Sequence, residues 1–179
     1  MKKNVWYSLS VLTLLFAFFV TNNVQAYTLL AGKYPSHLSS NLKWYIDQSA
    51  SDMNYGQHIV KVLNWNSSPY YITVGSSVNV ASNAQLRFYY DGEDKGKTVA
   101  INSNYESSKN VTSYSVIKLH LGFKNTSSAN KNETIVHEVG HSLGLDHEDT
   151  LYSIMLSEGF IGRDTPTSDD WAGIKAKYQ

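Results

Sequence analysis

Residues 137–147 read His-Glu-Val-Gly-His-Ser-Leu-Gly-Leu-Asp-His. His137 and His141 are four residues apart, so on an α-helix they lie about 40° from each other around the axis and both rings leave the same face. Such a pair can hold one zinc ion. Glu138 stands beside the pair, where its carboxylate could act on a metal-bound water.

The residues that follow can supply a third ligand to the same ion. Gly144 can adopt a positive φ, the usual way to end a helix and turn the chain sharply, and the turn can return His147 to the metal. Three nitrogen ligands leave one tetrahedral position open for water, which is typical of a catalytic zinc site. The alternative is a helix with surface histidines and an incidental Glu138, but the glycine and the third histidine at this spacing make the pattern specific.

This stretch resembles the long zinc-binding motif of the metzincin metallopeptidases, and its second half is most similar to that of the matrixins. The matrixins comprise the matrix metalloproteinases and their small bacterial relatives. The resemblance implies that His137, His141 and His147 bind zinc and that Glu138 is the general base. The reaction it implies is hydrolysis of a peptide bond by Glu-assisted attack of zinc-bound water, so we expect a zinc metalloendopeptidase.

A methionine downstream fits the same resemblance. Metzincins carry a methionine in a turn beneath the metal, and Met155 stands eight residues after His147, the matrixin offset. The resemblance implies a supporting role for Met155 without a bond to zinc, whereas an ordinary core methionine is the alternative. Some metzincins place a tyrosine two residues further on. Ser157 stands there in this chain, which favours a matrixin over an astacin-like or serralysin-like protein.

The resemblance also implies the zincin-like α+β fold, with three helices and a twisted, mostly parallel five-stranded sheet that has an antiparallel edge strand. The residue pattern agrees with this order of elements. Apolar and polar residues alternate, or β-branched and aromatic residues gather, in five predicted strands at 42–46, 70–74, 86–90, 98–101 and 116–121. Capping residues and helical spacing predict three helices, from Ser51-Asp52 to about Trp65, from Asn130 or Asn132 to the turn at Gly144, and over 166–178.

Several side chains have predicted places in these elements. Glu133 is expected in the first turn of the active-site helix, where a carboxylate suits the helix dipole. His58 is interpreted as a helix residue and His120 as part of the exposed face of a strand, neither as a ligand. The Ser/Asn-rich stretch 102–113 is predicted to be a loop. The buried faces of the first two helices are expected to consist of Tyr55, Ile59, Val62 and Leu63, and of Ile135, Val136, Val139 and Leu143.

The N-terminus has the pattern of a secretory signal peptide. Lys2 and Lys3 precede the apolar run 5–20, and Val24-Gln25-Ala26 offers small residues at the offsets that signal peptidase requires. Cleavage after Ala26 would remove residues 1–26 and leave 27–179 as one matrixin-like catalytic domain. An uncleaved membrane anchor is the alternative, because a run of 16 residues is near the lower limit for spanning a bilayer.

The composition argues against several classes of function. The chain has 15 basic and 15 acidic residues, and loss of Lys2 and Lys3 would leave 13 against 15, a net charge of −2. The sequence shows no charge asymmetry that would suggest binding to nucleic acid. It also shows no basic amphipathic helix that would suggest binding to a membrane surface. The chain has no cysteine, which favours a bacterial secreted protein over a disulfide-rich eukaryotic one. It also lacks the cysteine with which many matrixins block the open zinc position.

We therefore expect a monomeric extracellular enzyme that acts on protein or peptide substrates and has no stable membrane association after signal cleavage. By resemblance, an extended substrate would add to the edge strand near 98–102 and face the segment after the methionine turn. Two other functions stay open: a non-enzymatic secreted zinc-binding protein, and a zinc amidase acting on cell-wall peptides. Asp91, Glu93 and Asp94 lie where matrixins often bind structural calcium, although a solvated turn explains them equally well.

Overall fold

The structure is a computed structural model that describes residues 27–67 and 72–179. The predicted signal peptide, 1–26, and the first two residues of the predicted strand at 70–74 lie outside the described residues. No helix in the described part of the chain is long and apolar enough to cross a membrane.

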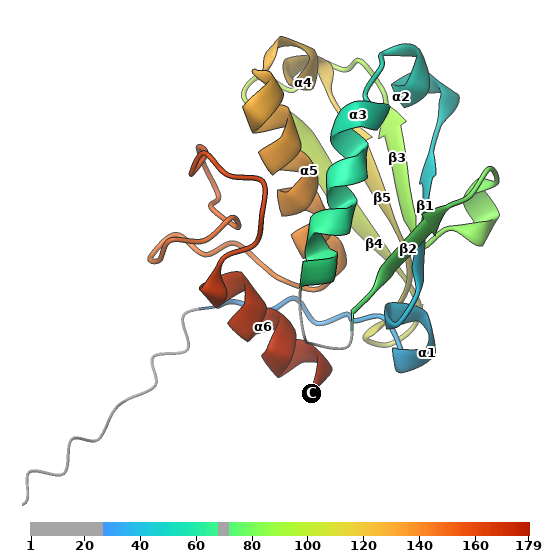
Figure 1. Cartoon of the computed structure of the whole chain (residues 1–179), viewed down its shortest axis with the longest axis vertical. Helices are drawn as coiled ribbons and strands as arrows, with labels where there is room; N and C mark the ends of the chain where they lie inside the picture. The colour runs from blue at the N-terminus through green and yellow to red at the C-terminus, as the bar shows by residue number, and fades with distance from the viewer. Residues whose placement is uncertain (1–26, 68–71) are drawn as a thin grey trace, which may run out of the picture.

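A five-stranded sheet forms the centre of the protein, with strand order β2-β1-β3-β5-β4 (Figure 1). The pairs β1–β2, β1–β3 and β3–β5 are parallel, and only the terminal pair β4–β5 is antiparallel. The predicted mostly parallel α+β sheet with an antiparallel edge strand is therefore confirmed. The strands are β1 (Leu42–Ile46), β2 (Val74–Ser77), β3 (Leu86–Tyr90), β4 (Ala100–Ser108) and β5 (Val111–Leu119).

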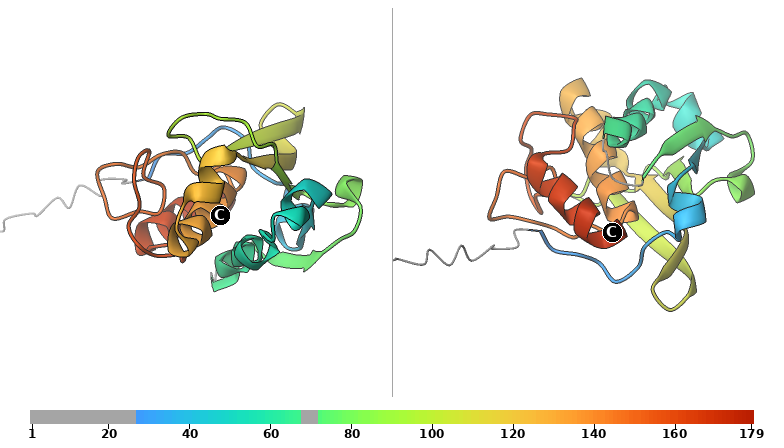
Figure 2. Two further views of the ribbon diagram at one scale, coloured as in Figure 1. Left: turned by 90° about the horizontal axis from the view of Figure 1, so that it is seen from above. Right: turned by 60° about the horizontal axis from the view of Figure 1, so that its bottom comes forward.

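Helices α3 and α5 lie side by side against one face of this sheet, and α6 lies beside the C-terminal end of α5 (Figures 1 and 2). Three helical regions were predicted. The first corresponds to α2, α3 and η1 together, the second to α5 and the third to α6, and the described residues also form the short helices α1, α4 and η2. The helices are α1 (Ser36–Ser39), α2 (Gln48–Asp52), α3 (Gly56–Ile59), α4 (Leu121–Asn125), α5 (Ser128–Ser142) and α6 (Ser168–Tyr178), with 3₁₀ helices η1 (Val60–Ser67) and η2 (Ala81–Asn83).

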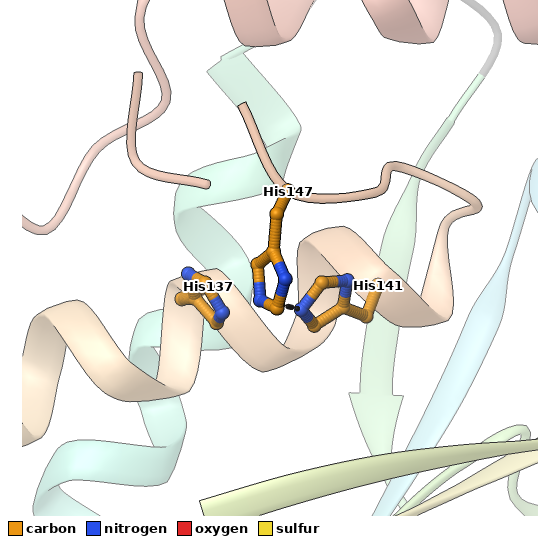
Figure 3. Close-up of side chains that lie close together, drawn as sticks. All are labelled: His137, His141 and His147. Atoms are coloured by element: carbon orange, nitrogen blue, oxygen red, sulfur yellow. Dashed lines mark hydrogen bonds between the residues drawn. The ribbon is translucent and has the colours of Figure 1, made fainter. Parts of the chain in front are cut away.

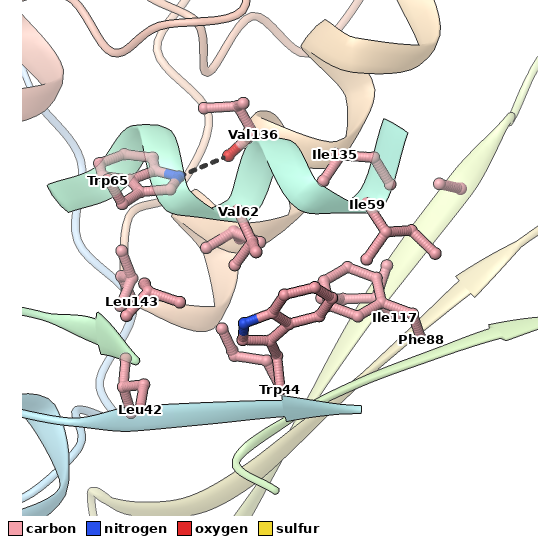
Figure 4. Close-up of a cluster of buried hydrophobic side chains, with 14 of the residues drawn as sticks. Leu42, Trp44, Ile59, Val62, Trp65, Phe88, Ile117, Ile135, Val136 and Leu143 are labelled. Carbon is pink, nitrogen blue, oxygen red and sulfur yellow. Dashed lines mark hydrogen bonds between the residues drawn. The ribbon is translucent and has the colours of Figure 1, made fainter. Parts of the chain in front are cut away.

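The core lies between the sheet and the two helices, as Figure 4 shows. Alternate residues of β1 and β3 face inward, among them Trp44 and Phe88, and they meet side chains of α3, η1 and α5. Trp65 is fully buried, and its indole N–H donates to the carbonyl oxygen of Val136 at 3.0 Å. This bond satisfies the one polar atom of a large buried side chain and fixes η1 against α5.

The first helical region differs from the prediction in its start and in its buried face. It begins at Gln48, because the Asp47 carboxylate accepts from the Ser49 N–H at 3.0 Å and caps it. Asn54, with φ of 57°, then separates α2 from α3.

From Val60 onward the helix is 3₁₀, with three residues per turn, so Ile59, Val62 and Trp65 line up toward the core. Tyr55, Ile59 and Val62 are buried as expected. Leu63 is 37% exposed, so its predicted burial was wrong.

The predicted loop at 102–113 is also wrong, because this polar stretch forms most of the β4–β5 hairpin. Lys109 and Asn110 make the turn, with Asn110 at φ of 62°, a conformation that asparagine tolerates well. Its polar side chains form hydrogen bonds with other parts of the protein. The side chain of Asn104 accepts from Ser115 Oγ at 2.6 Å and donates to the His141 carbonyl at 2.9 Å. Hydrogen bonds of this kind compensate a strand for its lack of apolar residues.

His120 does not lie on the exposed face of a strand, as predicted. β5 ends at Leu119, and His120 occupies the N-cap position of α4 with an exposure of 3%. Its Nδ1 lies 2.9 Å from an oxygen of Asp91. The apolar residues up to Leu121 predicted a longer strand. In the structure Leu121 and Phe123 belong to α4 instead.

Candidate metal centre

The helix that carries the motif, α5, is capped at both ends. Ser127 is its N-cap, with the side-chain oxygen accepting from the Asn130 N–H at 3.2 Å, so the predicted caps at Asn130 and Asn132 were wrong. At the other end Gly144 has φ of +93°, and the Leu145 N–H donates back to the Gly140 carbonyl at 3.0 Å. The predicted turn at Gly144 is present. The expected buried residues of this helix, Ile135, Val136, Val139 and Leu143, are all 0% exposed.

The three histidines of the motif come together above this helix, as Figure 3 shows. One ring nitrogen from each of His137, His141 and His147 lies within 4.8 Å of the other two. The Nε2 atoms of His141 and His147 are 3.2 Å apart. In the described part of the chain no other group of three or more histidine or acidic side chains could hold a metal ion in this way.

This donor set fits a tetrahedral zinc ion. Two nitrogens that each lie 2.0–2.1 Å from a tetrahedral zinc are about 3.3 Å apart, close to the 3.2 Å between His141 and His147. Three histidine ligands would leave one of the four tetrahedral positions without a protein ligand, which is typical of catalytic zinc sites.

Hydrogen bonds orient two of the rings for this purpose. His137 Nδ1 donates to the Ile154 carbonyl at 2.8 Å, and His141 Nδ1 donates to the Leu145 carbonyl at 2.9 Å. A proton held at Nδ1 leaves the lone pair of Nε2 free to bind a metal. Burial lowers the pKa of His137 to about 3, with the nearby His141 adding to the effect, and burial also lowers the pKa of His141. Both rings are thus kept neutral, the form that a metal requires.

Glu138 follows the first histidine and is 6% exposed. Burial raises the pKa of its carboxyl group to about 8, while a hydrogen bond from the Asn102 backbone acts in the opposite direction. Asn102 belongs to β4, so the acid lies where the active-site helix meets the edge strand. Its position beside the histidine cluster is the one that the motif predicts.

Met155 lies beneath α5 and is 2% exposed. Gly140 makes room for it, because a Cβ at that position would overlap the methionine sulfur. The turn before Met155 is held by Asp170 of α6, whose carboxylate accepts from Ser153 Oγ at 2.6 Å and from the Ile154 N–H at 3.2 Å. The turn therefore packs against α5 at Gly140, and through the Ile154 carbonyl it also holds the ring of His137.

A cleft of about 760 Å³ opens at the histidine cluster. Residues 97–102, which lead into and begin β4, line one wall, and residues 156–160 line the opposite wall. β4 is the terminal strand of the sheet, so its outer edge has no strand partner among residues 27–67 and 72–179. The predicted arrangement, an edge strand facing the segment after the methionine turn, is therefore present.

The other residues considered from the sequence lie apart from this cluster. His58 pairs with Asn132 Oδ1 at 2.7 Å and is packed in the protein, as predicted. The acidic loop makes contacts of its own: Asp91 with His120, Glu93 with Lys95 at 2.6 Å, and Asp94 with the Gly96 N–H at 2.9 Å. Calcium binding by this loop stays a prediction.

Glu133 makes a set of hydrogen bonds that was not predicted from the sequence. It lies in the second turn of α5 rather than the first, is 4% exposed, and accepts hydrogen bonds from three backbone N–H groups at 161–163. The sequence does contain a pattern that relates Glu133 to the histidines. Glu133, His137 and His141 follow each other at intervals of four residues, so all three occupy the same helix face.

The family model described as Matrixin matches residues 24–179. No curated protein matches the chain.

Substitution of Gly144 by alanine tests the turn that brings the third histidine to the cluster. We expect Gly144→Ala to lower the free energy of unfolding by about 1–3 kcal/mol, because the residue would be strained at positive φ and its Cβ would come 2.8 Å from the Gly32 carbonyl oxygen. The affinity for zinc should fall with it. Chemical denaturation and zinc titration measure both effects.

Gly96→Ala is the matched control, because Gly96 also has a positive φ, of +63°, but its Cβ would meet nothing within 4 Å. It should strain the backbone similarly and leave zinc affinity unchanged. Equal zinc affinity in Gly144→Ala and Gly96→Ala would contradict the role of the turn at Gly144.

Proposed function

The chain belongs to the matrixin family, and from this premise we propose that it is a secreted zinc-dependent endopeptidase. The observation that carries the proposal is the convergence of His137, His141 and His147 at one end of a cleft. Glu138 and an unpaired strand edge line the same cleft. A metal site, an acid–base group and a place for an extended chain are the three parts that peptide hydrolysis needs.

The three histidines would hold the zinc ion as neutral imidazoles. When bound, zinc supplies a Lewis acid that polarises a carbonyl oxygen and lowers the pKa of a water molecule. Glu138 would accept the proton of the attacking water and pass it to the nitrogen of the leaving amine. Met155 and Asp170 would not touch the metal or the substrate. They would hold the turn whose Ile154 carbonyl keeps His137 in place.

The substrate would bind as an added strand along the outer edge of β4. Backbone N–H and C=O groups at a free edge can pair with an extended peptide regardless of its sequence, which gives affinity without strong selectivity. Ile101 at this edge is 47% exposed, so an apolar side chain is available to the ligand. Selectivity would then come from the opposite wall, residues 156–160.

Two features support secretion of residues 27–179 as the catalytic domain. The family match begins at residue 24 and so leaves out the apolar run 5–20. The basic residues, the apolar run and the small residues before Tyr27 follow the order of a cleavable signal. We propose that residues 1–26 are removed and that the enzyme acts outside the cell.

Removal of the Glu138 carboxylate tests the mechanism. We expect Glu138→Ala to lower kcat/KM by about a hundredfold to ten-thousandfold, the usual contribution of a general base, while zinc remains bound in stoichiometric amount. The assay is cleavage of an unfolded protein by the zinc-loaded chain, with a chelator abolishing the activity. Asp52→Asn is the control, because it changes an exposed carboxylate of α2, outside the cleft. Full activity in Glu138→Ala would sink this mechanism.

The same assay separates the two other functions. Stoichiometric zinc without turnover on any peptide library would show a non-enzymatic zinc-binding protein. Turnover of peptidoglycan fragments but not of proteins would show an amidase of the cell wall.

Secretion has a direct test in the mass of the mature chain. Expressed in full in a bacterial host, the protein should appear outside the cytoplasm with Tyr27 as its first residue. Mass spectrometry of the intact protein measures this. A chain that stays in the membrane fraction with its apolar run attached would rule out the proposed cleavage.

A further inference from the structure

Glu133 is a buried carboxylate with an unusual set of partners. Its Oε1 accepts from the Ile161 N–H at 2.6 Å, and its Oε2 accepts from the N–H groups of Gly162 and Arg163 at 2.9 and 3.1 Å. Three consecutive backbone donors thus converge on one side chain that is 4% exposed. Charge-assisted bonds of this kind are among the stronger hydrogen bonds in proteins.

The position of Glu133 relates it to the proposed active site. It precedes His137 by four residues on the same face of α5, which places it about 6 Å further along the helix axis from the histidine cluster. Glu133 and Thr134 line the cleft together with His137. A substrate side chain that enters beside His137 and runs along the helix would therefore reach Glu133 at the end of its path.

The residues that Glu133 holds follow directly after the far wall of the cleft. Residues 156–160 line that wall, and 161–163 are the anchored residues. The wall has a second fixed point at its start, where Asp149 accepts from the N–H and the hydroxyl of Ser157, both at 2.7 Å. After the anchor, Asp164 pairs with Lys61 at 2.8 Å.

The wall between these fixed points has little packing of its own. Gly159 has φ of +86°, and a Cβ on it would meet nothing within 4 Å. Phe160 is 41% exposed. The shape of the wall therefore depends on where its two ends are held, and Glu133 holds its C-terminal end.

The three backbone N–H groups explain why a carboxylate stands at this buried position. A buried carboxylate loses its hydration, and this cost is recovered only through its hydrogen bonds. An apolar residue would line an apolar pocket without that cost, but it could not bind the three N–H groups. The carboxylate is therefore suited to fixing the backbone of this loop close to the helix.

We infer that Glu133 is a positioning residue for the substrate: by holding 161–163 against α5 it sets the floor of the side-chain pocket and so limits the length of the side chain that is accepted. The inference rests on the proposed peptidase function. It predicts that short and medium linear side chains are cut well and that longer ones are rejected until the floor is released.

The test uses the zinc-loaded protein and a peptide that the wild type cuts. Each residue flanking the cut is replaced in turn by linear side chains of increasing length, from norvaline through norleucine to aminooctanoic acid. In Glu133→Ala we expect kcat/KM for the longest side chain to rise by about tenfold relative to kcat/KM for norvaline, the gain from burying one or two further methylenes. Glu133→Gln keeps the size of the side chain and one acceptor oxygen, so its shift should be smaller and in the same direction.

Hydrogen exchange gives a second readout that does not depend on activity. The amides of 161–163 should exchange faster in Glu133→Ala than in the wild type, and Glu133→Gln should lie between them. Asp52→Asn is the control, because it removes an exposed carboxylate of α2, outside the cleft, and should change neither exchange at 161–163 nor the length preference.

The outcomes separate the two claims. If the wild type cuts peptides and both Glu133 variants keep its length preference, the inference is overturned and the proposed function stands. If Glu133→Ala does not fold, the length preference of Glu133→Gln alone decides whether the inference stands. If the wild type cuts no peptide while binding zinc, the proposed function fails, and the role of Glu133 in substrate selection fails with it.

Discussion

The hydrogen bond from His137 Nδ1 to the Ile154 carbonyl links the parts of the proposed active site. On one side it fixes the ring so that Nε2 points toward the other histidines. On the other side it reaches the turn before Met155, whose backbone Asp170 holds from α6. Helix α5, the methionine turn and the C-terminal helix are thus joined at one point, and a shift of the turn would move the ring of His137.

The turn at Gly144 is the second constraint, because it decides whether His147 can meet the other two rings. Its backbone is tied to the N-terminal segment, since the Leu30 N–H donates to the Gly144 carbonyl and the Asp146 N–H donates to the Thr28 carbonyl, both at 2.9 Å. The residues just after the proposed cleavage site therefore brace the loop that carries the third histidine.

Much of the fold could be predicted because its signals are local. The spacing of His137, Glu138 and His141 with Gly144 defines a helix and its end, and the alternation in 86–90 defines a strand. The failures come from interactions between distant residues. The polar hairpin at 102–113 is stabilised by bonds such as Ser115 to Asn104, and Glu133 has partners 28–30 residues away. No local pattern reports such contacts, although the four-residue spacing from Glu133 to His137 was a usable hint.

The central claim is that three histidines form one zinc site with an open position, and X-ray absorption at the zinc edge tests it most directly. The account predicts three nitrogen neighbours at about 2.0–2.1 Å and one oxygen neighbour for the zinc-loaded protein. It also predicts the loss of one nitrogen neighbour in His147→Ala. A coordination shell made mostly of oxygen, or one that His147→Ala leaves unchanged, would contradict it.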